Sequence, residues 1–166
     1  MTNTLRDRVL TAVAATGVVF EAMDCDPDLA DTATFCAHYD IPLDHSANAI
    51  MLASKRPAGL YAVFLVLATT RLDVNGMGRK LMDVKKVSFA PSDVTARETG
   101  MVIGGVTPFG LPQDLHVYVD GAIVERSWVI VGGGTRDLKL KIDPTVFTYM
   151  ENVTVVADLA RPAESL

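Results

Sequence analysis

Residues 100–110 of the chain read GMVIGGVTPFG, and the second part of this run, residues 104–110, holds three glycines and one proline. This composition leaves no room for a helix or a strand, so it predicts a rigid loop. Glycine permits positive φ and close approach to the backbone, while Pro108 fixes its own φ and restricts Thr107. The loop could present backbone N–H groups to a carbonyl or phosphate oxygen, or simply form a tight turn between a helix and a strand.

A second glycine cluster, GGGTR at residues 132–136, directly follows an apolar strand that ends at Val131. Glycine runs at such a place often mark phosphate contact. The next segment, DLKLKI at residues 137–142, alternates like a strand and does not open a helix. Without a helix N-terminus, a dinucleotide-binding fingerprint is excluded. The first loop is not a P-loop either, because the Gly-Lys-Ser/Thr ending is missing.

The elements around these two loops alternate irregularly along the chain. Helices are expected over residues 5–13, 31–39, 76–82, 92–98 and 143–150. Strands are expected over residues 18–23, 49–53, 60–68, 86–90, 116–119, 128–131, 139–142 and 153–156. Residues 60–68 are apolar on both faces, which is typical of a central strand covered on each side. The sequence therefore predicts one α+β domain over residues 1–166, with a mixed, barrel-like β-sheet flanked by short helices.

Composition limits the possible functions. The 166 residues are 49% hydrophobic and 21% charged, which excludes a disordered or fibrous chain. The formal net charge is -5, so the chain lacks the overall basic excess of a nucleic-acid binder. Any RNA contact therefore requires a local basic patch.

The cysteines, histidines and apolar runs give mostly negative indications. Cys25 and Cys36 are too few for a disulfide framework, and together with the three histidines they lack the spacing of a metal site. Both thiols are interpreted as structural, with Cys25 the better nucleophile candidate. The longest apolar run, residues 60–68, is far shorter than the ~20 residues that span a bilayer, and the first helix is preferred over a signal peptide. We expect no cofactor, no metal, no membrane association and a cytoplasmic location.

With both loops in view, the chain resembles the YbaK/ProX family of aminoacyl-tRNA deacylases, which is related to the editing insert of prolyl-tRNA synthetase. The segments that carry the resemblance are RLD at 71–73, GMVIGGVTPFG at 100–110, Asp120, and residues 132–140, in order and spacing from residue 47 to about 159. The resemblance implies a mixed, barrel-like sheet flanked by helices. It also implies hydrolysis of the ester between a mischarged amino acid and the tRNA 3′ end.

The family's Gly-x-x-x-Pro element falls on residues 104–108, and in the family this loop surrounds the aminoacyl ester and the terminal adenosine. The implied catalytic residues are Asn48, Gly104, Thr107 and Pro108. The implied substrate-binding residues are Gly105, Val106, Phe109, Gly110, Asp120, Gly132, Gly133, Arg71 and Lys80. Backbone donors would stabilise the charge that develops on the ester carbonyl, and water or a substrate hydroxyl would attack. No protein nucleophile is then required.

One position departs from the family pattern. Where many members have Lys-Thr-Leu-Leu, this chain has ANAIML at residues 47–52, which places Asn48 at the position of the pocket lysine. Lys55 cannot replace that lysine, because it points to the opposite face of the strand and lies ~20 Å away. We expect Asn48 to face the pocket on the same side as Ile50 and Leu52, although it could instead bridge neighbouring backbone.

Two alternatives follow from this departure. Without the lysine, the chain could be a non-catalytic tRNA- or ligand-binding member of the fold, or a small-molecule esterase that uses the same loop. The basic side chains could surround the pocket mouth and contact tRNA phosphates, or form an ordinary solvated surface. These side chains are Lys55, Arg56, Arg79, Lys80, Lys85, Lys86, Arg136, Lys139 and Lys141.

Overall fold

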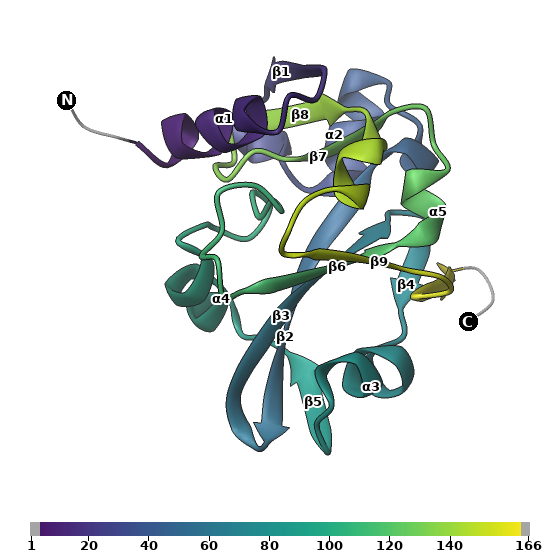
Figure 1. Ribbon diagram of the computed structural model, residues 1–166. Coiled ribbons are helices and arrows are strands. Elements are labelled where there is room, and N and C mark those ends of the chain that lie inside the picture. Colours follow the sequence, from purple (N-terminus) through teal and green to yellow (C-terminus); the bar gives the residue numbers. More distant parts are fainter. Residues whose placement is uncertain (1–3, 164–166) are drawn as a thin grey trace.

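The computed structural model describes residues 4–163 (Figure 1). The helices are α1 (Leu5–Ala15), α2 (Thr32–Tyr39), α3 (Arg79–Met82), α4 (Ser92–Thr99) and α5 (Gly121–Val124). The strands are β1 (Phe20–Asp24), β2 (Ala47–Arg56), β3 (Ala58–Leu67), β4 (Thr70–Leu72), β5 (Lys86–Phe89), β6 (His116–Asp120), β7 (Val129–Gly132), β8 (Leu138–Ile142), β9 (Val153–Val156) and β10 (Ala160–Pro162). Shorter helical turns are η1 (Pro27–Leu29), η2 (Leu43–His45), η3 (Val74–Gly78) and η4 (Pro144–Thr148).

The strands form three sheets. The largest has the order β5-β2-β3-β6-β9, with β3, β6 and β9 parallel to one another and the other pairs antiparallel. A second, antiparallel sheet has the order β1-β8-β7, and β10 pairs with β4. A single parallel bridge between Ser46 and Ile130 joins the two larger sheets. The predicted mixed α+β fold is confirmed, although the strands do not close into one barrel.

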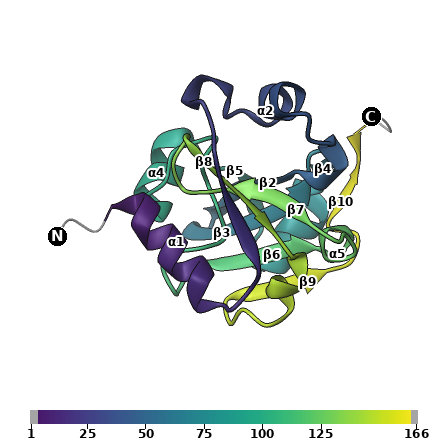
Figure 2. The same ribbon diagram turned by 90° about the horizontal axis from the view of Figure 1, so that it is seen from above.

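Both faces of the large sheet are buried. On one face, Val63 and Leu65 of β3 pack with α1 and with the inner face of the three-stranded sheet. On the other face, Phe64 packs with residues of β4 and β5. A third cluster joins α2 to the outer face of β7 through Phe35 and Ile130. Figure 2 shows α1 and α2 at opposite sides of the three-stranded sheet, which lies over the larger one.

The β2–β3 hairpin is the longest paired unit and the one that the sequence indicated most clearly. Its register runs from Ala47 opposite Leu67 to Lys55 opposite Ala58, with a shift near Ser54. Strand β3 occupies the centre of the five-stranded sheet, as its continuous apolar run predicts. The hairpin therefore carries one end of β2 towards α2 and the other end away from it (Figure 1).

Several short elements differ from the expectations. The helix expected over residues 76–82 is the π-helical turn η3 followed by α3, and its cap is Asp73, whose carboxylate accepts from the N–H groups of Gly76 and Met77. The helix expected over 143–150 is the 3₁₀ helix η4, which begins after Asp143 as the capping pattern predicts. Strands β4 and β10 and helix α5 were not predicted, because three or four residues carry no periodicity.

Two further observations concern the part of the chain that the structure describes. No helix between residues 4 and 163 combines the length and the apolar character needed to cross a membrane. Within the same range, no three or more His, Cys, Asp or Glu side chains gather where they could hold a metal ion. Cys25 and Cys36 are buried, free thiols.

Candidate functional site

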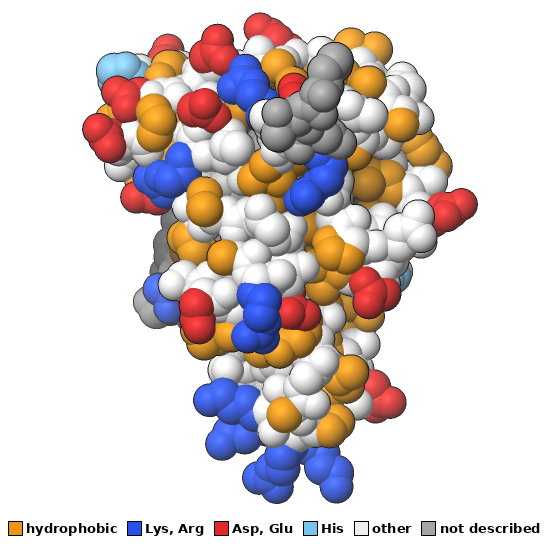
Figure 3. All heavy atoms as spheres, turned by 90° about the vertical axis from the view of Figure 1, so that its left-hand side faces the viewer, with side chains coloured by type: hydrophobic (Ala, Val, Ile, Leu, Met, Phe, Trp, Pro, Cys, Tyr) orange, Lys and Arg blue, Asp and Glu red, His pale blue; other side chains and the backbone are white. Residues whose placement is uncertain are grey.

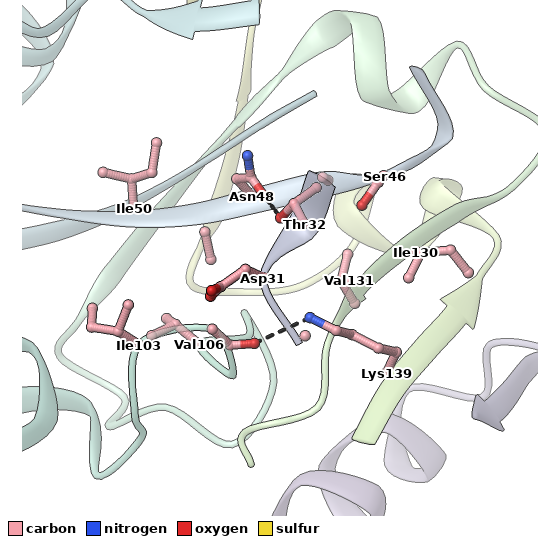
Figure 4. Close-up of a pocket in the computed structure, with 14 residues that line it drawn as sticks. Asp31, Thr32, Ser46, Asn48, Ile50, Ile103, Val106, Ile130, Val131 and Lys139 are labelled. Atoms are coloured by element: carbon pink, nitrogen blue, oxygen red, sulfur yellow. Dashed lines mark hydrogen bonds between the residues drawn. The ribbon is translucent and has the colours of Figure 1, made fainter. Parts of the chain in front are cut away.

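A cavity of about 290 Å³ opens where the start of β2 meets the start of α2, the loop at residues 103–106 and the end of β7 (Figure 4). Its apolar lining comes from Ala47, Ala49, Ile50, Ile103, Val106, Ile130 and Val131. The other lining residues are Asp31, Thr32, Ser46, Asn48, Gly104, Gly132 and Lys139. A cavity of this size lies at the lower end of the range for small-ligand sites, which is roughly 300–1,000 Å³.

The two glycine clusters pack directly against each other beside this cavity. The N–H of Gly134 donates to the carbonyl oxygen of Gly105 at 2.6 Å. A Cβ atom on Gly132 would lie 2.5 Å from the carbonyl oxygen of Val106, and one on Gly105 would lie 2.9 Å from the carbonyl oxygen of Gly134. Only glycine permits two backbones to approach this closely. The glycines at these positions are therefore required for loop–loop packing, whatever the loops also bind.

Lys139 enters the cavity from β8. This strand alternates, so Leu138 and Leu140 lie in the core between the sheets while Lys139 points the other way, with its Nζ 5.3 Å from the centre of the Phe35 ring on α2. Lys139 is only 6% exposed. Its Nζ donates to the carbonyl oxygens of Ala30 at 2.8 Å and Gly104 at 3.1 Å.

The ammonium of Lys139 has no neutralising partner. Among residues 4–163, no carboxylate lies within 4 Å of its Nζ. Burial lowers the pKa of this side chain below its usual 10.5, because desolvation disfavours the charged form. An ammonium has three N–H donors, and two are taken by the carbonyl oxygens. The third has no acceptor within residues 4–163.

Arg136 ties the mouth of the cavity together. Its guanidinium donates to the carbonyl oxygen of Ile103 at 3.0 Å and to that of Pro27 at 3.1 Å, and it lies 3.4 Å from the carboxylate of Asp31. One side chain therefore contacts η1, the residue before α2 and the glycine loop. Gly104 lies beside it at φ +89, where an added Cβ would be 2.3 Å from an Arg136 nitrogen.

Asn48 lies at the start of β2 on the opposite wall of the cavity (Figure 4). Its side-chain oxygen accepts a hydrogen bond from the hydroxyl of Thr32, the first residue of α2. Its amide nitrogen has no hydrogen-bond partner within residues 4–163. A neutral donor from β2 and a charged donor from β8 therefore line the same space.

The family model of the aminoacyl-tRNA editing domain matches residues 26–149, a span that contains every residue lining the cavity. The chain belongs to this family. A curated relative of this editing domain, the uncharacterized protein YwhH of Bacillus subtilis (strain 168), is 31% identical over 111 residues, which cover 67% of the chain and 70% of YwhH. The family resemblance visible in the sequence is thereby confirmed.

Solved structures share the fold of this editing domain at lower identity. The hypothetical protein APE2540 matches with a TM-score of 0.81 and 22% identity, over 93% of this chain and 99% of its own. A protein described as a candidate trans-editing enzyme for prolyl tRNA synthetase matches with a TM-score of 0.79 and 18% identity, over 98% of this chain and all of its own. At such identities these likenesses establish the architecture.

The structure brings together only some of the residues that the sequence suggested for the site. Asn48, Gly104, Val106 and Gly132 line the cavity of the editing domain. Gly105 and Gly133 lie in the packed backbone beside it, where an added Cβ would meet the other loop or the side chain of Leu138. Thr107 is fully buried, and its hydroxyl has no partner in the described chain.

The other suggested residues lie elsewhere. Pro108, Phe109 and Gly110 line a separate groove next to α1, and Arg71 lines another, between β4 and β5. Lys80 is exposed on α3. Asp120 is buried at the end of β6 and makes no side-chain capping hydrogen bond to α5, and burial raises the pKa of its carboxyl.

Sequence reasoning missed the roles of Asp31, Thr32 and Lys139 at the cavity. Lys139 was grouped with the basic side chains that could surround the pocket mouth or form a solvated surface, because the LKLKI pattern alone does not show which strand face is covered. The signal that could have identified it is the α2 helix, which must cover some strand face with its buried Phe35 and Cys36. Because α2 covers this face of β8, Lys139 is buried and not exposed to solvent.

Proposed function

We propose that this editing domain hydrolyses the ester that joins a mischarged amino acid to the 3′ end of tRNA, acting in trans on the acceptor end in the cytoplasm. The burial of Lys139 in the cavity is the single observation that best supports this proposal. It offers a buried, unneutralised ammonium with one free N–H in a cavity bounded by the glycine loop. Ester hydrolysis builds negative charge on the carbonyl oxygen, and a preorganised donor at that place lowers the barrier.

In the proposed mechanism, water attacks the carbonyl carbon of the ester. A new C–O bond forms, the carbonyl oxygen gains charge, and the ribose hydroxyl leaves with a proton when the ester C–O bond breaks. The third N–H of Lys139 is one donor for the developing oxyanion. The backbone N–H groups of Gly104 and Val106 are candidates for further donors, since they have no acceptor within residues 4–163.

The chain's own nucleophiles are not required. Cys25 and Cys36 are buried, and burial raises the pKa of both thiols, which is the opposite of the shift that activates a catalytic cysteine. No Ser-His-Asp arrangement is needed either, because the donors stabilise a water-derived oxyanion.

The lining of the cavity favours a small, apolar aminoacyl group. Ala47, Ala49 and Val106 leave room for a short side chain, and Ile50 and Ile103 give it apolar contact. The carboxylate of Asp31, largely exposed at the mouth, is placed to pair with the α-ammonium of the substrate.

Asn48 favours a second candidate, a member of the fold that binds the tRNA end without hydrolysis. If the family mechanism depends on a lysine at the start of β2, the neutral amide cannot supply its charge. Lys139 supports the first candidate, because it brings a cation to the same cavity from the other wall.

A deacylation screen tests the proposal. The intact protein is incubated with a panel of tRNAs mischarged with small and large amino acids, and with free aminoacyl esters. We expect release of small apolar amino acids from tRNA, and loss of this release in Lys139→Met. Binding of aminoacyl-tRNA without turnover would support the second candidate, and cleavage of free esters as fast as of aminoacyl-tRNA would indicate a small-molecule esterase.

A further inference from the structure

A cluster of cations lies at the far end of the molecule from the cavity. Lys55 and Arg56 end β2, Lys86 begins β5 and Lys85 directly precedes it, and all four side chains are exposed. We call these four residues the basic tip. Figure 3 shows Lys and Arg side chains gathered at the lower end of the molecule, the end that the β2–β3 hairpin and β5 form in Figure 1.

The backbone forces these cations together. Arg56 lies opposite Lys86 in the antiparallel β2–β5 pair, and the N–H of Lys85 donates to the carbonyl oxygen of Arg56 at 2.8 Å. Like charges directly opposite each other in a sheet are destabilising. No residue of the basic tip has a carboxylate within 4 Å in the described chain. The repulsion within the basic tip therefore lowers the stability of the fold, and a bound anion would relieve it.

The rest of the surface is acidic. Residues 54–90 carry seven Lys and Arg against two Asp, whereas the remaining sequence carries eight Lys and Arg against eighteen Asp and Glu. Elsewhere, Arg6, Arg97, Arg126, Arg136 and Arg161 each lie within 4 Å of a carboxylate. A polyanion is thus attracted to one end of the molecule and repelled by most of the rest, which fixes its orientation.

The chemistry of the tip fits RNA phosphates better than a protein partner. Stable protein interfaces bury ~800 Å² on each side around an apolar, largely uncharged centre. Near this hairpin end, the large exposed hydrophobic side chains are only Leu60 and Phe89. Phosphate contacts need no apolar centre and no side-chain specificity.

The tip cannot take part in the chemistry, because it lies too far from the cavity. Asn48 and Lys55 are seven residues apart on one strand, which corresponds to ~23 Å. An RNA whose 3′ end enters the cavity would reach the tip with a distant part of its duplex. Double-stranded RNA presents its phosphates and 2′-hydroxyls for contacts of this kind.

We propose that the basic tip is a docking site for the phosphate backbone of an RNA stem, which anchors the RNA ~20 Å from the cavity. This inference rests on the proposed function for the identity of the RNA, a tRNA. Lys80 and Arg79 on the neighbouring α3 extend the same charged end of the molecule. The tip supplies affinity for any tRNA, and the cavity selects the aminoacyl group.

The test compares two double variants that remove the same charge. Arg56→Gln/Lys86→Gln alters the tip, and Arg6→Gln/Arg126→Gln removes two arginines of the acidic part of the surface. Binding of fluorescently labelled, uncharged tRNA is measured by anisotropy at several salt concentrations. Hydrolysis is measured on mischarged tRNA and on a 3′-aminoacyl adenosine, which has no stem.

We expect the tip variant to bind tRNA roughly tenfold to a hundredfold more weakly at about 0.1 M salt, with a log–log salt slope smaller by about 1.5. Its rate of hydrolysis of the aminoacyl adenosine should match that of the parent. Its thermal unfolding midpoint should be equal to or higher than that of the parent. The control variant should bind tRNA within twofold of the parent.

Two results would overturn the proposal. Equal weakening of tRNA binding in both variants would indicate an effect of net charge alone, and unchanged tRNA binding in the tip variant would show that the tip does not contact the RNA. Failure of the proposed function looks different. In that case the parent hydrolyses neither substrate, and anisotropy still decides whether the tip binds RNA.

Discussion

Replacing Lys139 by Met removes one charge and three donors while keeping an unbranched side chain that is one atom shorter. Two carbonyl oxygens, those of Ala30 and Gly104, lose a donor in a cavity that water can enter. Hydrogen bonds to a charged group contribute about 1.5–3 kcal/mol each, but burying an ammonium costs several kcal/mol. These effects oppose each other, so we expect the free energy of unfolding to change by no more than about 2 kcal/mol.

The effect on turnover should be much larger. If the free N–H of Lys139 holds the developing oxyanion, its loss resembles removal of an oxyanion-hole donor, which raises the barrier by about 2.7–4 kcal/mol. The expected fall in kcat is therefore about a hundredfold to a thousandfold. KM should change little, because the interaction forms mainly in the transition state.

The assay is single-turnover deacylation of the best mischarged tRNA, combined with denaturant unfolding of the same preparations. Lys141→Met is the matched control, because Lys141 lies on the same strand, over the Trp128 ring at 4.6 Å and outside the cavity. It should keep its parental rate. If Lys139→Met also hydrolyses at the parental rate while folded, the ammonium has no part in the chemistry. Lys139→Arg keeps the charge. It should therefore retain more activity than Lys139→Met if the Met variant loses activity for electrostatic reasons.

The remaining predictions concern packing, the β2 wall and pH. Gly132→Ala should lower the free energy of unfolding by more than about 2 kcal/mol in urea titration, because its Cβ would press on the backbone carbonyl of Val106, which cannot move aside like a side chain; an unchanged midpoint would contradict the loop–loop packing. Asn48→Ala should reduce deacylation at least tenfold with little change in melting temperature, while a stable but unaffected enzyme would exclude Asn48 from the site. Asn48→Lys should increase deacylation if the reaction needs a positive charge at the start of β2, and an unchanged rate would show that the charge of Lys139 is enough for hydrolysis. Burial lowers the pKa of Lys139 in the folded protein, so between that lowered value and 10.5 the unfolded state binds more protons than the folded state. In this pH window the free energy of unfolding of the parent, minus that of Lys139→Met, should therefore rise with pH. Below the window this difference should not depend on pH.

The sequence predicted the elements that a continuous run of residues indicates by its composition alone. The apolar run of β3 identified a central strand, and the two glycine clusters identified segments that the structure places side by side. The contact between these clusters, at Gly105 and Gly134, depends on tertiary packing, so no local pattern reveals it. The family resemblance compensated for this in part, because it grouped the same segments into one site.

The suggested residues that lie outside the cavity, and the lining residues that the sequence did not indicate, can be explained in physical terms. Arg71 and Asp120 belong to segments that follow the family's order along the chain, but this order does not specify which end of a strand faces the cavity. Lys80 belongs to none of these segments. Asp120 instead is buried at the end of β6, outside the lining of the cavity. Lys139 was missed because its strand has two apparently exposed positions and only the packing of α2 buries one of them.

The ammonium of Lys139 is held by main-chain carbonyls alone. Because every residue type offers the same carbonyl oxygen, a substitution at position 30 that keeps the backbone path leaves that anchor in place, whereas the φ of +89 at Gly104 and the nearby Arg136 nitrogen require glycine at the other anchor. The side chains that shape the cavity, such as Ile50, Ile103 and Ile130, make no hydrogen bond to it. The apolar lining of the cavity can therefore change side chain by side chain without disturbing the placement of the charge.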